Sequence, residues 1–138
     1  MVTIYLAGPL FSQAEREFNK KLESMFLEIG FSVFLPQEDA EDNDVERHNQ
    51  NQSGIFASCF AGLETSDLVV AVLEGADIDS GTAWELGYAF AAGLPIIGLR
   101  TDFRIHTPNE KVNLMIQETV DAFVFSVEEL QAVLEKYV

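Results

Sequence analysis

The feature that most constrains the fold is a run of six apolar residues, Leu-Val-Val-Ala-Val-Leu, at positions 68–73. A strand with one face in solvent alternates apolar and polar residues, whereas this run is apolar at every position. Such strands are typical of parallel sheets that are covered by helices on both faces. The sequence therefore predicts an α/β protein with this strand near the middle of its sheet.

Helical patterns alternate with further short apolar runs along the chain. After Ser12, residues 13–29 place apolar side chains three and four apart and end before Gly30, which predicts an amphipathic helix. Residues 37–51 are polar and acidic and are predicted to form a long loop. The other predicted strands are 2–7, 31–35, 94–99 and 122–125, and the other predicted helices are 55–63, 81–92, 112–118 and 127–136.

This alternation predicts a single domain over residues 1–138, a length sufficient for one substantial core. The fold class is a flavodoxin-like (Rossmann-like) three-layer sandwich with about five parallel strands in the order 2-1-3-4-5. Ligands bind such a sheet at the carboxyl ends of its first and third strands. We therefore expect the site between loops 8–12 and 74–85.

The acidic balance of the chain excludes some partners. Asp and Glu total 23 against 8 Lys and Arg, a net charge of −15, so nucleic acid is not an expected partner. No apolar run is long enough to cross a membrane and no signal-like start is visible, so the expected location is cytoplasmic. One cysteine and two histidines offer no metal-ligand spacing, so we expect chemistry without metal or cofactor.

Glu85 is the main candidate for chemistry. Glu74, Asp77 and Asp79 lie in the loop after the predicted central strand, and Glu85 follows in or just after the first turn of the next predicted helix. Unpaired N–H groups and the helix dipole would keep a carboxylate there ionised and able to attack carbon. Acids near a helix start also serve simply as caps, which is the plain alternative for Asp79 or Ser80.

Three motifs carry a resemblance to a known family. They are Ile-Tyr-Leu-Ala-Gly-Pro-Leu-Phe at 4–11, Asp-Ser-Gly-Thr-Ala-Trp-Glu-Leu-Gly-Tyr at 79–88 and Val-Asn-Leu-Met at 112–115. In that order and spacing they resemble the nucleoside 2-deoxyribosyltransferase family over nearly the whole chain. The resemblance implies an enzyme that moves 2-deoxyribose between nucleobases, with retention, through a covalent adduct on Glu85. Its partners would be 2'-deoxynucleosides and free nucleobases.

The resemblance also implies roles for individual residues. Tyr5 would hold the Glu85 carboxylate, and Asp79 would bind a sugar hydroxyl. Asn113 would reach the 5' end of a sugar held by a neighbouring subunit, which implies a homo-oligomer, a dimer or higher. We take Gln37 as the reader of the base. The other residues placed in the substrate site are Gly8, Pro9, Phe11, Cys59, Gly81 and Met115.

Cys59 departs from the family pattern. It stands where the family commonly has an aspartate that contacts the base and assists its departure. A cysteine is a poor general acid and is more often a small buried hydrophobe. Asp77, Glu64, Glu38 or Asp39 could deliver the proton instead, and the sequence does not choose among them.

Two other functions stay open. An N-glycosidase acting on 2'-deoxynucleoside 5'-monophosphates or modified nucleosides would share the fold and nucleophile, and Arg100 and Arg104 could hold a phosphate. Asp79 favours nucleosides, because it would repel a 5'-phosphate and accept a hydrogen bond from a 5'-hydroxyl. A non-catalytic nucleoside-binding module is the third alternative, because a fold alone does not assign an activity.

Overall fold

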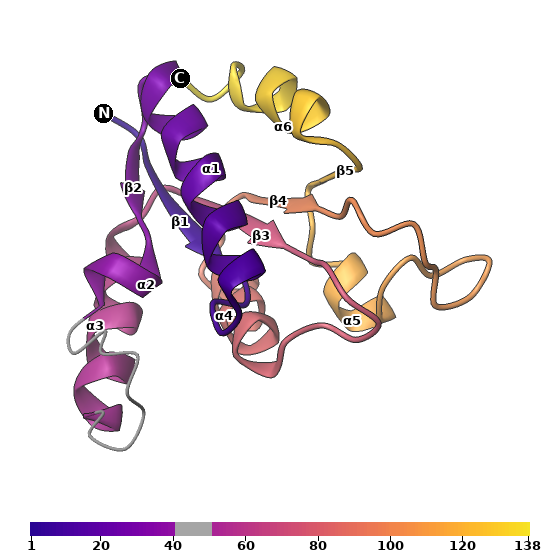
Figure 1. Cartoon of the computed structure of the whole chain (residues 1–138), viewed down its shortest axis with the longest axis horizontal. Helices are drawn as coiled ribbons and strands as arrows, with labels where there is room; N and C mark the ends of the chain where they lie inside the picture. Colours follow the sequence, from indigo (N-terminus) through magenta and orange to yellow (C-terminus); the bar gives the residue numbers. More distant parts are fainter. Residues whose placement is uncertain (41–50) are drawn as a thin grey trace.

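A computed structural model describes residues 1–40 and 51–138 of the chain (Figure 1). The described residues contain a five-stranded sheet in the order β2-β1-β3-β4-β5, and every pair of neighbouring strands is parallel. The predicted flavodoxin-like order is therefore confirmed. The strands are β1 (Thr3–Ala7), β2 (Ser32–Phe34), β3 (Leu68–Val72), β4 (Ile96–Leu99) and β5 (Ala122–Val124).

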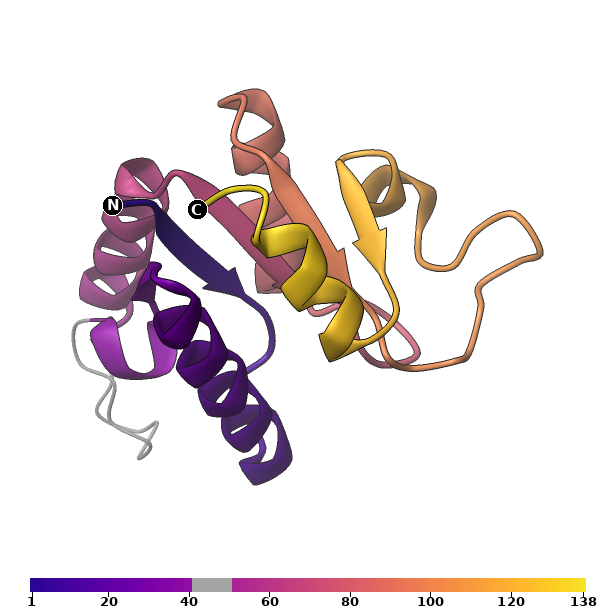
Figure 2. The same ribbon diagram turned by 90° about the horizontal axis from the view of Figure 1, so that it is seen from above.

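Helices cover both faces of this sheet. Figure 2 shows α1 (Gln13–Ile29) and α6 (Val127–Leu134) together on one face, with α3 (Gln52–Thr65) and α4 (Ser80–Ala91) behind the sheet on the other. The three layers of the sandwich follow from this arrangement.

The central strand explains why two cores form. Leu68, Val70 and Val72 pack with α1 and α6, whereas Val69, Ala71 and Leu73 pack with α3 and α4. All six side chains are buried. The run of six apolar residues thus supplies both layers, as the sequence predicts.

Local capping sets where the helices begin. Ser12 and Glu15 form a capping box at the start of α1, which begins directly after Ser12 as predicted. Asn51 accepts a hydrogen bond from Gly54 N and starts α3 three residues earlier than predicted. Asn113 caps α5 (Leu114–Gln117), which is therefore shorter than the predicted helix 112–118.

The predicted loop 37–51 is wrong at its beginning. Residues Pro36–Asp39 form the short helix α2, with Pro36 in its first turn, where a fixed φ suits a helix. Residues 41–50 lie outside the described residues. None of the described helices is both long and apolar enough to cross a membrane.

Candidate active site

Glu85 on α4 and Tyr5 on β1 meet at the carboxyl end of the sheet. The Tyr5 hydroxyl donates a hydrogen bond to Oε2 of Glu85. The Tyr5 ring is fully buried and stacks on Phe34, with 5.4 Å between ring centroids. Gly62 allows this stack, because a Cβ there would lie 2.7 Å from the Phe34 ring. The structure therefore brings together the two residues expected to carry the chemistry and holds Tyr5 rigidly.

Burial, and not the helix terminus, has the largest effect on the pKa of the Glu85 carboxyl. Burial raises the pKa of Glu85 from 4.5 to about 7, the Tyr5 hydrogen bond opposes the rise, and Asp79 adds to it. Because α4 begins at Ser80, Glu85 lies beyond the turn whose N–H groups are unpaired. The expectation that the helix start keeps Glu85 ionised is therefore wrong.

Glu85→Gln is expected to stabilise the protein in alkaline solution. Because its pKa is raised in the folded state, the Glu85 carboxyl makes its full contribution to stability below about pH 4.5. This contribution is lost as the pH rises through about 7. The variant should match the wild type in acid and exceed it by up to ~3 kcal/mol above neutrality. Urea unfolding across this pH range measures the difference. A difference that does not change with pH would contradict the burial of an ionisable group here.

A pocket of about 450 Å³ opens beside Glu85. This volume suits a small organic ligand. Its walls come from both expected loops and from α3, so it occupies the crevice at the switch point of the sheet. The site residues expected from the sequence that line it are Gly8, Phe11, Cys59, Asp79, Gly81 and Glu85.

Gly8 and Asp79 shape two walls of this pocket. A Cβ at Gly8 would lie 2.9 Å from the Val72 Cβ, so glycine lets the loop after β1 approach β3 closely. Asp79 Oδ2 accepts hydrogen bonds from the backbone N–H and the hydroxyl of Thr82, both at 2.9 Å. Asp79 is therefore the N-cap of α4 and a pocket residue at once.

Gln37 and Pro9 lie outside the pocket lining. The Gln37 side chain accepts a hydrogen bond from Asn19 Nδ2 at 3.0 Å and donates one to the Arg16 carbonyl at 3.1 Å. These hydrogen bonds connect α2 to α1. The described site therefore gives no support to the prediction that Gln37 reads the base. Pro9 lines a separate cavity on the α1 side of the same loop.

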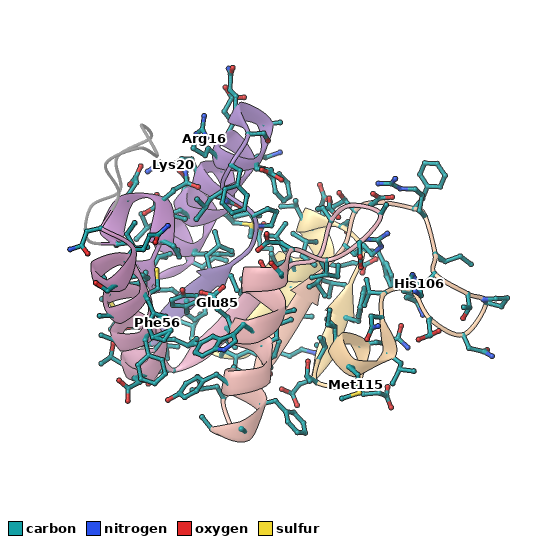
Figure 3. All side chains as sticks on the ribbon, turned by 90° about the horizontal axis from the view of Figure 1, so that it is seen from below. Arg16, Lys20, Phe56, Glu85, His106 and Met115 are labelled. Carbon is teal, nitrogen blue, oxygen red and sulfur yellow. The ribbon has the colours of Figure 1, made fainter. Side chains whose placement is uncertain are left out.

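Asn113 and Met115 also lie apart from Glu85. Figure 3 shows Glu85 and Phe56 on one side of α4 and Met115 on the other. Asn113 and Met115 line a second pocket, of about 620 Å³, together with Phe90 of α4. Within one chain, therefore, these two residues do not join the Glu85 pocket.

Cys59 is half-buried beside the Tyr5 hydroxyl, with which it interacts. Burial raises the pKa of the Cys59 thiol. A thiol with a raised pKa is a weak acid at neutral pH, so Cys59 is poorly suited to donate a proton to a departing base.

The other acids that were candidates for protonating the base lie elsewhere. Glu38 pairs with Lys20, and Asp39 accepts a hydrogen bond from the backbone N–H of Leu35 at 2.6 Å. Asp77 lines the second pocket, and Glu64 is exposed on α3. The pocket that the described residues form beside Glu85 is lined by none of these four side chains.

An aromatic cluster beside Glu85 was not predicted from the sequence. It comprises Phe56 and Phe60 of α3 with Trp84 and Tyr88 of α4, and the centroids of rings in contact lie 5.0–6.3 Å apart. Phe56, Phe60 and Trp84 line the pocket, and about half of Phe56 and of Trp84 is exposed. The four-residue spacing within each helix was a visible signal, because residues four apart share one helical face.

The two arginines proposed as phosphate ligands bind other groups of the protein instead. Arg100 is 3% exposed and donates hydrogen bonds to the carbonyls of Leu73 at 2.6 Å and Gly75 at 2.9 Å. Arg104 pairs with Asp102 at 2.5 Å. The expectation that Arg100 is available to a phosphate is therefore wrong, since it holds the ends of β3 and β4 together.

Solved structures of other proteins share this architecture. A conserved protein from Enterococcus faecalis V583 is 30% identical, covers 100% of this chain and 99% of its own, and superposes with a TM-score of 0.86. A 2-deoxyribosyltransferase from Bacillus psychrosaccharolyticus is 25% identical, with coverage of 99% and 93% and a TM-score of 0.79. A CMP N-glycosidase from Clostridium botulinum, at 17% identity, coverage of 96% and 98% and a TM-score of 0.63, shares the fold.

The family model described as nucleoside 2-deoxyribosyltransferase matches residues 4–116. This span includes Tyr5, the aromatic cluster and Glu85. The proteins named above show that glycosyl transferases and N-glycosidases both use this fold. The match covers most of the sequence, and the chain belongs to the nucleoside 2-deoxyribosyltransferase family.

Proposed function

We propose that this protein is a nucleoside 2-deoxyribosyltransferase that moves 2-deoxyribose from one nucleobase to another. The observation that carries the proposal is the carboxyl of Glu85, held by the Tyr5 hydroxyl at the edge of a pocket large enough for a small organic ligand. A carboxylate in that position is a nucleophile that Tyr5 both orients and keeps more acidic.

The reaction would proceed in two displacements at the anomeric carbon. Glu85 attacks C1' as the first base leaves, which forms a glycosyl ester, and a second base then attacks C1' from the face that the first one left. Two inversions give net retention. A 2'-deoxy sugar favours this route, because no electron-withdrawing 2'-hydroxyl opposes positive charge at C1'.

The pocket favours nucleosides over 5'-monophosphates. Among the described residues, no lysine or arginine lines it, whereas Asp79 and Glu85 do. A phosphate beside two carboxyl groups would lack a cationic partner and would be repelled. The described pocket lining therefore supports a nucleoside substrate and offers no phosphate ligand to a 5'-monophosphate N-glycosidase.

An exchange assay tests the proposal directly. The protein is incubated with a 2'-deoxynucleoside and an isotopically labelled different base, and we expect labelled deoxynucleoside to form. Accumulation of free deoxyribose without exchange would establish a hydrolase instead. Nucleoside binding that Glu85→Ala leaves unchanged, with no turnover of either kind, would establish a non-catalytic binding module.

We further propose that a neighbouring subunit completes the site with Asn113. The surface that α4 and α5 form next to Asn113 is apolar and open, with Phe90 of α4 and Leu114 and Met115 of α5 each more than half exposed. A Cβ on Gly87 would meet no described atom within 4 Å, so a second helix could approach α4 closely there. These features support a homo-oligomer that packs through this face.

Mixing two inactive variants tests the shared site. Asn113→Ala and Glu85→Gln homo-oligomers should both be impaired, but a mixed oligomer contains one site with both native residues. We therefore expect deoxyribosyl exchange to reappear after the two variants are unfolded and refolded together, measured against each refolded alone. If the mixture stays as inactive as its components, Asn113 does not act across an interface.

A further inference from the structure

As the described residues of one chain form it, the Glu85 pocket has no side chain suited to protonating a departing base. Its titratable lining residues, within the described part of the chain, are Cys59, Asp79 and Glu85. Glu85 is the nucleophile, Asp79 Oδ2 already accepts two hydrogen bonds from Thr82, and burial weakens Cys59 as an acid. General acid catalysis by a positioned side chain contributes about 10²–10⁴ in rate, so its absence selects among leaving groups.

The same pocket offers aromatic faces close to carboxylates. Phe56, Phe60 and Trp84 line it. The ring centroids of Phe56 and Trp84 lie 5.6 Å apart, and the centroid of Phe60 lies 6.0 Å from that of Phe56 and 6.2 Å from that of Trp84. Aromatic faces attract cations, and a cation lying against such a face can gain up to about 2 kcal/mol once it is desolvated. The carboxylates of Asp79 and Glu85 and a net charge of −15 add to that attraction.

We propose that the preferred donor is a 2'-deoxynucleoside whose base carries a fixed, delocalised positive charge. An N7-alkylated purine and a pyridinium ring linked through its nitrogen share this chemistry. The inference rests on the proposed glycosyl transfer at Glu85 and specifies its substrate class.

A cationic base removes the need for an acid. A Glu85 oxygen forms a bond to C1' as the C1'–N bond breaks, and the electron pair of that bond passes to the base nitrogen. This electron pair neutralises the positive charge of the ring. The base therefore leaves as a neutral molecule, and no proton is transferred. An uncharged base leaving by the same route would depart as an anion, which is costly in a pocket of aromatic rings and carboxylates.

Turnover of matched donors provides the first test. The pair is 7-methyl-2'-deoxyguanosine and 2'-deoxyguanosine, with spontaneous decay subtracted by using Glu85→Gln as the blank. We expect kcat/KM for the charged donor to be higher by a factor of about 10²–10⁴. A 2-deoxyribosyl nicotinamide arm shows whether a pyridinium ring is accepted as well as an alkylated purine.

These measurements distinguish a failure of the substrate inference from a failure of the proposed function. If 2'-deoxyguanosine is used as well as its methylated form, in a reaction that depends on Glu85, the inference is overturned and the proposed function stands. If no donor is turned over above the Glu85→Gln blank, the proposed function fails and the inference falls with it.

Binding separates recognition of charge from the intrinsic reactivity of a charged donor. On Glu85→Gln, 7-methyl-2'-deoxyguanosine is compared with 7-deaza-7-methyl-2'-deoxyguanosine, which has nearly the same shape and no charge. We expect the cation to bind about 10-fold more tightly, and Trp84→Leu or Phe56→Leu to reduce that preference several-fold. Phe103→Leu, which changes a side chain that is 94% exposed and lies outside the pocket lining, is the matched control and should leave the preference intact. Equal affinity for the two ligands would overturn the inference.

Discussion

Glu85→Gln is expected to lower deoxyribosyl transfer by a factor of about 10³ or more, because an amide oxygen is a far weaker nucleophile than a carboxylate. The substitution keeps the side-chain volume and an oxygen able to accept the Tyr5 hydrogen bond, so the pocket should persist. The exchange rate at a pH above the Glu85 pKa of about 7 is the measurement. In the wild type, a 2-fluoro deoxyribosyl analogue should label Glu85, as read by peptide mass spectrometry.

Glu64→Gln is the matched control for this prediction. Glu64 is an exposed glutamate on α3 and does not line the pocket, so its replacement should leave transfer unchanged. Labelling of another residue by the analogue, or full transfer by Glu85→Gln, would remove Glu85 as the nucleophile.

The fold was predictable because its signals are local. The apolar run at 68–73 requires burial on both faces, and the Ser12 and Glu15 capping box fixes the start of α1. The errors are local too. Pro36 was interpreted as the end of a strand, whereas it also starts α2, because proline suits both positions.

The candidate site was predictable where one motif supplies its residues. Tyr5 and Gly8 come from β1 and the loop after it, Asp79 and Glu85 come from the N-cap and second turn of α4, and the strand order brings these two segments together. The aromatic cluster was not predictable in this way. It depends on how α3 packs beside α4, which no single stretch of sequence specifies.

Side-chain partners explain the remaining misses. The sequence shows that Gln37 and Arg100 are polar, but not which groups they bind. The side chain of Gln37 forms hydrogen bonds with Asn19 and the Arg16 carbonyl, and Arg100 donates to backbone carbonyls. The raised pKa of Glu85 has the same origin. It depends on burial against β1, and the sequence shows only the distance of Glu85 from the helix start.

Tyr5→Phe is expected to shift the acidic limb of the activity profile to higher pH. In the wild type, kcat/KM should rise with pH through about 7, because the attacking form of Glu85 is the carboxylate. The Tyr5 hydrogen bond lowers the pKa of Glu85, so its removal raises that pKa further. A hydrogen bond to a charged group contributes about 1.5–3 kcal/mol, which corresponds to a loss of about 10- to 100-fold at neutral pH.

The shift of the limb distinguishes this role of Tyr5 from a purely structural one. Tyr5→Phe retains the ring that stacks on Phe34, so the fold should persist and part of the lost activity should return in alkaline solution, where Glu85 ionises despite its higher pKa. Tyr137→Phe removes a hydroxyl from the opposite face of the sheet and should leave both the limb and the rate in place. A uniform loss at every pH, with the limb still near 7, would show that Tyr5 does not set the ionisation of Glu85.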